Sequence, residues 1–139
     1  MAKAAALTKQ VSAGNWGRVL AVISKSFGGC LAEKFLNSLS ASDQAKCFAV
    51  FDQMASYGPE QVNKKRFKSE MDGLCAFKFE IDKRQIRFPC FRDGNCWIIT
   101  HGFFKPGAQQ GLGDWPNEHI DRAKNIRDEY IQRKSKAST

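Results

Sequence analysis

Basic side chains are the residues of this sequence best suited to chemistry. Lys78 and Arg87 lie in segments where polar and apolar residues alternate, so they project from the face opposite the apolar side chains. Arg92 and Lys105 follow at the ends of such segments. Guanidinium and ammonium groups bind phosphodiesters, and they stabilise the charge that develops when a 2′-hydroxyl attacks the adjacent phosphorus. These cations therefore predict contact with a phosphate-bearing polymer, and they could support RNA cleavage.

Aromatic residues could extend this surface. Phe91 is interleaved with the cations and could stack on a base, while Tyr130 could approach from a C-terminal helix. A basic group with a lowered pKa, or a tyrosine, could move protons without a metal. Arg87 has a second interpretation, in which it only forms a surface ion pair with Glu80 on the neighbouring strand. The residues alone leave both interpretations open.

Three other kinds of site find little support. The glycines from Gly107 to Gly113 form neither of the usual phosphate-loop motifs. His101 and His119 are the only histidines and lie on different elements, which argues against a metal site. Cys96 and His101 face opposite sides of one strand and cannot form a nucleophilic pair. We therefore expect neither a metal nor a cofactor.

Composition sets the class of protein. The chain has 139 residues and a formal net charge of +8, from 22 Lys and Arg against 14 Asp and Glu. The length fits one domain, and no apolar run approaches a membrane span or a signal peptide. Five cysteines without metal spacing are typical of a reducing compartment. We expect a cytoplasmic protein with a basic flexible tail over 1–15, one domain over 16–134 and a frayed end over 135–139.

Hydrophobic spacing predicts the elements of the N-terminal half. Residues 16–23 are β-branched and aromatic and predict a strand. Residues 31–39 carry apolar side chains at helical spacing. Ser40 and Asp43 form a capping box that begins a second helix, and Gly58-Pro59 ends it. The expected unit is one strand followed by a two-helix hairpin.

A polar and basic stretch follows, over residues 60–72. Its cations are Lys64, Lys65, Arg66 and Lys68. The stretch could be a solvated connector or part of a rim that faces phosphate, and the sequence leaves both open. With Arg84, Phe91 and Arg92, these four cations are our candidates for binding RNA or phosphate.

Residues 74–104 predict a three-stranded antiparallel meander. Two alternating strands are followed by Asp93-Gly94, a pair that a tight type I′ turn prefers, and then by an almost wholly apolar strand. A second two-residue turn at Lys83-Arg84 would place Glu80 opposite Arg87. The centre of the protein is therefore expected to be a sheet with short hairpins.

This register divides the meander between two faces, since directly paired residues share a face. The first face is the expected core: Phe77, Phe79, Ile81, Ile86, Phe88, Cys90, Trp97 and Ile99. The second carries Lys78, Glu80 and Arg87 on an apolar floor, with Phe91, Cys96, Ile98 and Thr100. Cys90 and Cys96 then point to opposite faces, which argues against a disulfide. His101 falls on the core face, where packing explains it as well as catalysis does. Pro89 must lie at a bulge or beside an unpaired position.

A final helix is predicted after a loop over 106–114. Its buried stripe is Ile120, Ala123, Ile126 and Tyr130. The whole pattern predicts an α+β fold: an N-terminal strand and two-helix hairpin packed on a mainly antiparallel four-stranded sheet, with a C-terminal helix.

Several motifs, taken in order, carry a family resemblance. They are Phe35-Leu36-Asn37-Ser38-Leu39-Ser40 with Asp43, Gly73-Leu74, Arg87, His101-Gly102-Phe103-Phe104-Lys105, and Pro116 with Glu118, Ile120 and Ala123. This set resembles the RelE/ParE toxin superfamily, in the phage-derived, HigB-like branch of type II toxin–antitoxin toxins. The resemblance covers about residues 16–132 and implies the small RelE-like fold.

The resemblance also implies a function. Members of that branch are small basic proteins that cut mRNA in the ribosomal A site without a metal, and an antitoxin neutralises them. This chain would then be a ribosome-dependent mRNA endoribonuclease that inhibits translation. Lys78, Arg87 and Lys105 would bind phosphate and stabilise charge, with Tyr130 and His101 as further catalytic candidates. Its partners would be the ribosome, mRNA and a cognate antitoxin, expected to be a helix-turn-helix protein.

The chain departs from that branch in two motifs, in a longer loop after Lys105 and in an extended N-terminal tail. Ala76-Phe77-Lys78 stands where Glu-Leu-Arg is usual, and Pro106 stands where the signature has its second lysine. Arg and Lys are not equivalent at a site that binds phosphate with two parallel hydrogen bonds. Two other functions therefore stay open: a non-enzymatic ParE-like toxin that binds a protein such as gyrase, and an inactive phage-derived protein that binds nucleic acid or a partner.

Overall fold

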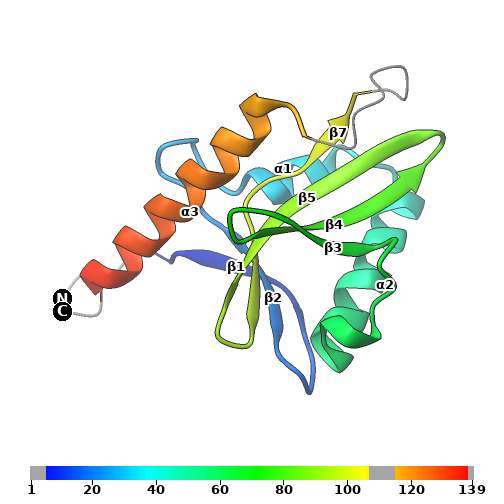
Figure 1. Ribbon diagram of the computed structural model, residues 1–139, viewed down its shortest axis with the longest axis horizontal. Helices are drawn as coiled ribbons and strands as arrows, with labels where there is room; N and C mark the ends of the chain where they lie inside the picture. Colours follow the sequence, from blue (N-terminus) through cyan, green and yellow to red (C-terminus); the bar gives the residue numbers. More distant parts are fainter. Residues whose placement is uncertain (1–5, 107–114, 138–139) are drawn as a thin grey trace.

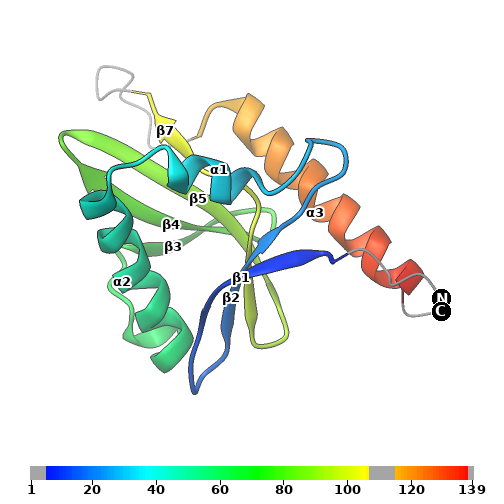
Figure 2. The ribbon, with the colours of Figure 1, turned by 180° about the vertical axis from the view of Figure 1, so that it is seen from behind.

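A computed structural model describes residues 6–106 and 115–137 of the chain. In this part, a seven-stranded sheet carries helices on both faces (Figures 1 and 2). The helices are α1 (Leu31–Asn37), α2 (Ala41–Tyr57) and α3 (Asn117–Ala137), with a 3₁₀ turn at Pro59–Gln61. The strands are β1 (Thr8–Ala13), β2 (Arg18–Val22), β3 (Phe67–Met71), β4 (Leu74–Ile81), β5 (Arg84–Asp93), β6 (Cys96–Ile99) and β7 (Phe103–Lys105). The predicted α+β class is confirmed.

The sheet is larger than the four strands that we predicted. Its order is β1-β2-β6-β5-β4-β3, with β7 also paired to β5; β2 and β6 are parallel and all other pairs are antiparallel. Strand β1 replaces part of the tail predicted over 1–15, and β3 lies within the polar stretch predicted over 60–72. Both are edge strands, which are commonly short and charged, so neither shows apolar alternation.

Strand β7 arises because the last apolar run divides in two. Strands β6 and β7 are separated by Thr100, His101 and Gly102. A Cβ on Gly102 would lie 2.7 Å from ring atoms of Phe35 and of Phe88, so the chain can bend this close to the core only at a glycine. The loop predicted over 106–114 lies almost wholly outside the described residues.

Each face of the sheet has its own core. Helices α1 and α2 cover the first, which contains all eight side chains predicted for the core face. Helix α3 covers the second, where Ala123, Ile126 and Tyr130 pack against Phe91 and Ile98. The second face is therefore not the open apolar floor that we predicted, because α3 buries much of it.

The helices begin and end close to the predicted positions. The Ser40 side chain accepts a hydrogen bond from the Asp43 backbone N–H at 3.1 Å, as the capping box requires. Helices α1 and α2 follow one another at an angle (Figure 2). Helix α3 continues to Ala137, three residues beyond the predicted end of the domain at 134. No helix in the described ranges is long and apolar enough to cross a membrane.

Gly17 provides a test of the parallel pairing between β2 and β6. A Cβ at this position would lie 1.9 Å from the backbone oxygen of Asn95, which also accepts a hydrogen bond from the Arg18 N–H. We expect Gly17→Ala to lower the free energy of unfolding by about 3 kcal/mol, since a backbone atom cannot move aside. Gly94 has a positive φ of 63° but open space around it, so Gly94→Ala should cost only about 1 kcal/mol. Equal losses in urea titrations would contradict this account.

Candidate functional site

Lys78 of β4 and Arg87 of β5 lie directly opposite each other. The prediction that Glu80 faces Arg87 was wrong by two residues. The turn consists of Asp82 and Lys83, whose φ angles of 53° and 64° are those of a type I′ turn, and not of Lys83-Arg84. A slide of two residues leaves each side chain on its predicted face. Two cations, rather than an ion pair, therefore meet across these strands.

Arg87 is a buried cation whose hydrogen bonds go to neutral acceptors. The residue is 7% exposed. Its guanidinium donates to the Ile86 carbonyl at 3.1 Å and to Gln85 Oε1 at 3.2 Å. No ion pair in the described ranges includes Arg87, and burial lowers its pKa. A buried guanidinium without a carboxylate partner is costly, so this environment favours a bound anion.

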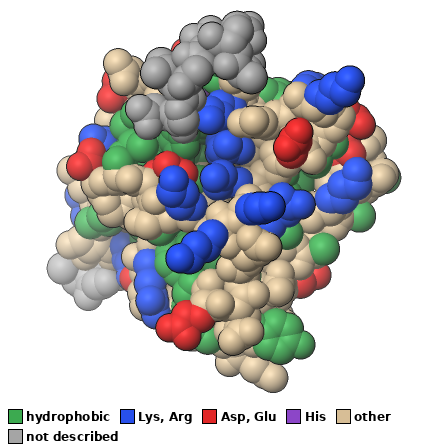
Figure 3. All heavy atoms as spheres, turned by 45° about the vertical axis from the view of Figure 1, so that its right-hand side comes forward, with side chains coloured by type: hydrophobic (Ala, Val, Ile, Leu, Met, Phe, Trp, Pro, Cys, Tyr) green, Lys and Arg blue, Asp and Glu red, His purple; other side chains and the backbone are tan. Residues whose placement is uncertain are grey.

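A hollow of about 210 Å³ opens beside Arg87 and Lys78. We call it the cationic hollow, and it is lined by Lys65, Arg66, Lys78, Phe79, Glu80, Gln85 and Arg87. Figure 3 shows Lys and Arg side chains gathered on the side of the molecule that carries β3, β4 and β5. Four of the predicted site residues thus line one hollow.

Two further predicted cations, Lys68 and Lys105, contribute to the electrostatic potential of this hollow. Burial lowers the pKa of Lys78, and the positive charges of Arg87, Lys68 and Lys105 lower it further, while Glu70 opposes them. The pairing of β7 with β5 places Lys105 opposite Gln85. The hollow therefore has a positive potential to which Lys68, Lys78, Arg87 and Lys105 all contribute.

The other candidates for binding RNA lie elsewhere. Phe91 is 5% exposed, packs against the Tyr130 ring and does not line the cationic hollow. The Arg92 guanidinium lies 5.2 Å from the centre of the Trp16 ring. Arg84 lies over the Phe104 ring, on the face covered by α1 and α2. Lys64 is exposed in the turn before β3.

His101 lies in a buried cluster away from the hollow. It is 1% exposed, and its Nδ1 and Nε2 atoms lie 2.9 Å from Thr100 Oγ1 and 3.2 Å from His119 Nδ1. The His119 ring stacks on Phe103, with the ring centres 3.9 Å apart. Burial lowers the pKa of His101 to about 3, with smaller effects from His119 and Arg122. His101 therefore stays neutral and holds the start of α3 against the sheet.

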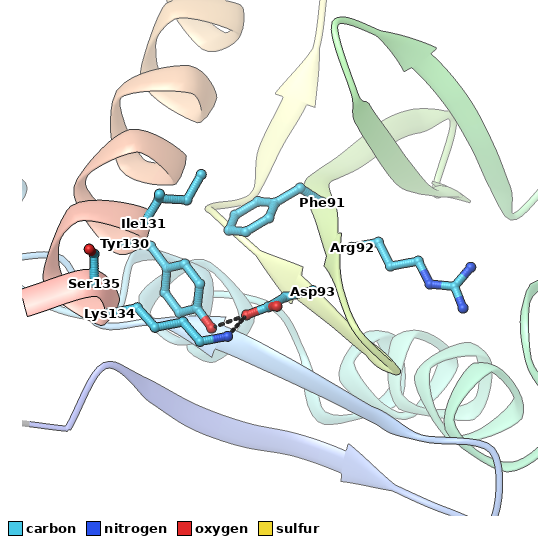
Figure 4. A pocket seen from close by; sticks show the side chains of 7 residues that line it. All are labelled: Phe91, Arg92, Asp93, Tyr130, Ile131, Lys134 and Ser135. Atoms are coloured by element: carbon cyan, nitrogen blue, oxygen red, sulfur yellow. Dashed lines mark hydrogen bonds and ion pairs between the residues drawn. The ribbon is translucent and has the colours of Figure 1, made fainter. Parts of the chain in front are cut away.

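Tyr130 lines a different hollow, of about 390 Å³, between α3 and the end of β5 (Figure 4). Its hydroxyl donates to Asp93 Oδ2 at 2.7 Å, and the Lys134 ammonium reaches the same oxygen at 2.5 Å. Burial, then the hydrogen bond to Asp93, raises the pKa of Tyr130. These contacts fasten α3 to the sheet and do not bring Tyr130 to the cationic hollow.

Two residues of the site were missed by sequence reasoning. Gln85 orients the Arg87 guanidinium, and Glu70 is the carboxylate whose field reaches both Lys78 and Arg87. Alternation could have found Gln85, which shares the face of Arg87 two residues away. Glu70 gave no such signal, because the register of β3 shifts between Ser69 and Met71. No three His, Cys, Asp or Glu side chains of the described ranges are grouped to hold a metal ion.

Comparison with known proteins identifies a family that this chain matches. Residues 34–128, well over half of the chain, match the model of a family described as "Phage derived protein Gp49-like (DUF891)". The matched segment runs from α1 into α3 and includes every residue that lines the cationic hollow. No curated protein and no solved structure matches the chain.

The burial of Arg87 predicts an unusual response to substitution. Because its charge is desolvated and lacks a carboxylate partner, Arg87→Met should raise the free energy of unfolding by about 1 kcal/mol. Inorganic phosphate should raise the melting temperature of the wild-type protein but not of Arg87→Met, since a ligand stabilises only the state that binds it. Calorimetry with and without phosphate measures both effects. A destabilised variant that still responds to phosphate would contradict the assignment.

His101 predicts a pH dependence of stability. The unfolded chain binds a proton on this residue below about pH 6.5, whereas the folded protein does not until about pH 3. The free energy of unfolding should therefore fall by up to about 1.4 kcal/mol for each pH unit below about pH 6. His101→Gln lacks this titration, so its urea midpoint should fall less between pH 7 and pH 4. Parallel curves for the two proteins would show that His101 makes no such contribution.

Proposed function

The chain belongs to the Gp49-like family of phage-derived proteins, a RelE/toxin-like family, and we propose that it is the toxin of a type II toxin–antitoxin pair in the HigB-like branch. Its activity is that of a ribosome-dependent, metal-independent mRNA endoribonuclease that inhibits translation. The observation that carries this proposal is the buried Arg87 guanidinium, which faces a hollow and lacks a carboxylate partner. A phosphodiester supplies the missing negative charge.

Arg87 and Lys78 bind the phosphate at which the chain is cut. The 2′-hydroxyl oxygen attacks phosphorus and loses its proton, the bond to the 5′ oxygen breaks, and that oxygen takes up a proton. The products are a 2′,3′-cyclic phosphate and a 5′-hydroxyl end. Extra negative charge develops on the phosphate oxygens during this step, and the two cations, with Lys105 nearby, stabilise it.

The remaining basic residues serve docking. Lys65 and Arg66 line the cationic hollow, and Lys68 contributes to its potential. Long-range attraction of this kind speeds the encounter with ribosomal RNA and mRNA and weakens as salt is added. A cognate antitoxin, of the helix-turn-helix type, neutralises the toxin.

Induced expression tests the proposal. Wild-type protein should arrest growth and translation, and new mRNA 5′ ends should appear inside translated codons. Arg87→Met should abolish both effects, by at least about 100-fold in cleavage, because the transition state loses a charge-stabilising group. Arg18→Met is the matched control, since it removes the same charge from an exposed position on β2 and should remain toxic.

Other outcomes point to other functions. Growth arrest with DNA damage and intact mRNA would replace this proposal with a ParE-like toxin that binds gyrase. Absence of arrest by wild-type protein would favour an inactive phage-derived protein whose basic face only binds nucleic acid or a partner. We expect Arg87→Met to be at least as stable as wild type, and the calorimetry described above separates a loss of activity from unfolding.

A further inference from the structure

A second hollow, of about 260 Å³, adjoins the cationic hollow. Lys46 and Ala49 of α2 form one side of it, and Ile81 at the end of β4 lies on the other. The two hollows share three lining residues: Arg66, Phe79 and Glu80. They therefore lie side by side at the edge of β4, and together we call them the edge groove.

The edge groove exists because β4 is longer than its neighbour β3. The pairing of these strands ends at Phe67 and Phe77, and the last backbone bond runs from the Lys78 N–H to the Arg66 carbonyl at 2.8 Å. Strand β4 continues to Ile81 without a described strand on that side. The groove thus passes from the face of the cationic hollow, around the open edge of β4, to the face covered by α2.

One carboxylate, Glu80, lies among the cations that line the groove. The Lys46 side chain is 59% exposed, and it forms a long ion pair with Asp43, at 3.8 Å. Arg66 lines both hollows, and the exposed Glu80 lies with it where they meet. Cations suit the phosphates of a nucleic acid, whereas a carboxylate repels them. A carboxylate does accept a hydrogen bond from a ribose 2′-hydroxyl, which RNA has and DNA lacks.

We propose that the two hollows are successive subsites for one single-stranded RNA chain. One phosphate binds at Arg87 and Lys78, a further phosphate binds at Lys46, and Glu80 accepts a hydrogen bond from the ribose hydroxyl between them. This inference rests on the proposed function, and it adds a path for the substrate and a basis for the choice of RNA over DNA.

Salt-dependent binding tests the second subsite. The probes are a fluorescent single-stranded RNA octamer, which spans both hollows, and a dinucleotide, which occupies only the first. Lys46→Ala should reduce the slope of log K against log salt by about 0.7 for the octamer, the value for one phosphate contact in single strands. The slope for the dinucleotide should not change. Lys25→Ala is the matched control, because it removes the same charge from the exposed turn after β2 and should alter neither slope.

A DNA octamer of the same sequence tests the role of Glu80. Wild-type protein should bind the RNA about fivefold more tightly than the DNA, the effect of one hydrogen bond. Glu80→Ala should remove this preference, mainly by weakening RNA binding. Glu60→Ala, at an exposed carboxylate in the 3₁₀ turn, should retain it.

Two results would overturn the inference while leaving the proposed function intact. In the first, Lys46→Ala and Lys25→Ala have equal effects on the octamer. In the second, Glu80→Ala keeps the preference for RNA. The proposed function itself fails if wild-type protein leaves mRNA intact or if Arg87→Met still cleaves mRNA, and neither result depends on Lys46 or Glu80, so the two failures are distinguishable.

Discussion

Strand β5 is the element on which both cores and the cationic hollow depend. Its one edge pairs with β4 along most of its length, while its other edge is shared by β6 and β7. Along β5, the pairing with β7 ends at Arg87 and the pairing with β6 begins at Cys90, so Pro89 lies in the gap between them. The Pro89 carbonyl accepts a hydrogen bond from the Thr100 N–H at 2.9 Å. The predicted unpaired position beside Pro89 is thereby confirmed. Because proline lacks an N–H, a continuous ladder here would lose a bond, and the break avoids that loss.

The same break explains why a cation on β5 becomes buried. After Thr100 the chain leaves the sheet and returns as β7, which places Phe103 beside Arg87. The ring of Phe103 belongs to the core under α3, together with Trp115. Arg87 is thus desolvated on one side by this core and opens on the other to the cationic hollow. Burial of the Arg87 charge lowers the stability of the fold, and it also holds the guanidinium in a fixed position before any ligand binds.

The parts of the structure that sequence predicted well are those set by apolar side chains. The residues of the core face were predicted correctly although both turns of the meander were misplaced. Each observed strand pairing differs from the predicted register by two residues, and a shift of two residues leaves every side chain on the same face of the sheet. The edge strands β1 and β3 were missed because only one of their edges is paired and their residues are polar. Phe91 and Tyr130 belong to the core under α3 and do not line the cationic hollow, and alternation alone cannot reveal which surface a distant helix will cover.

The position of one turn decides what Arg87 can do. Had the turn fallen at Lys83-Arg84, Glu80 would face Arg87 and neutralise it, as in an ordinary surface ion pair. With the turn at Asp82-Lys83, Glu80 faces the uncharged Gln85, and Arg87 faces Lys78. Like charges directly opposite each other destabilise a sheet. This repulsion and the burial of Arg87 both lower the stability of the fold, and under the proposed function a bound phosphate would offset the loss. The backbone geometry of a single hairpin therefore decides whether Arg87 faces a carboxylate or another cation.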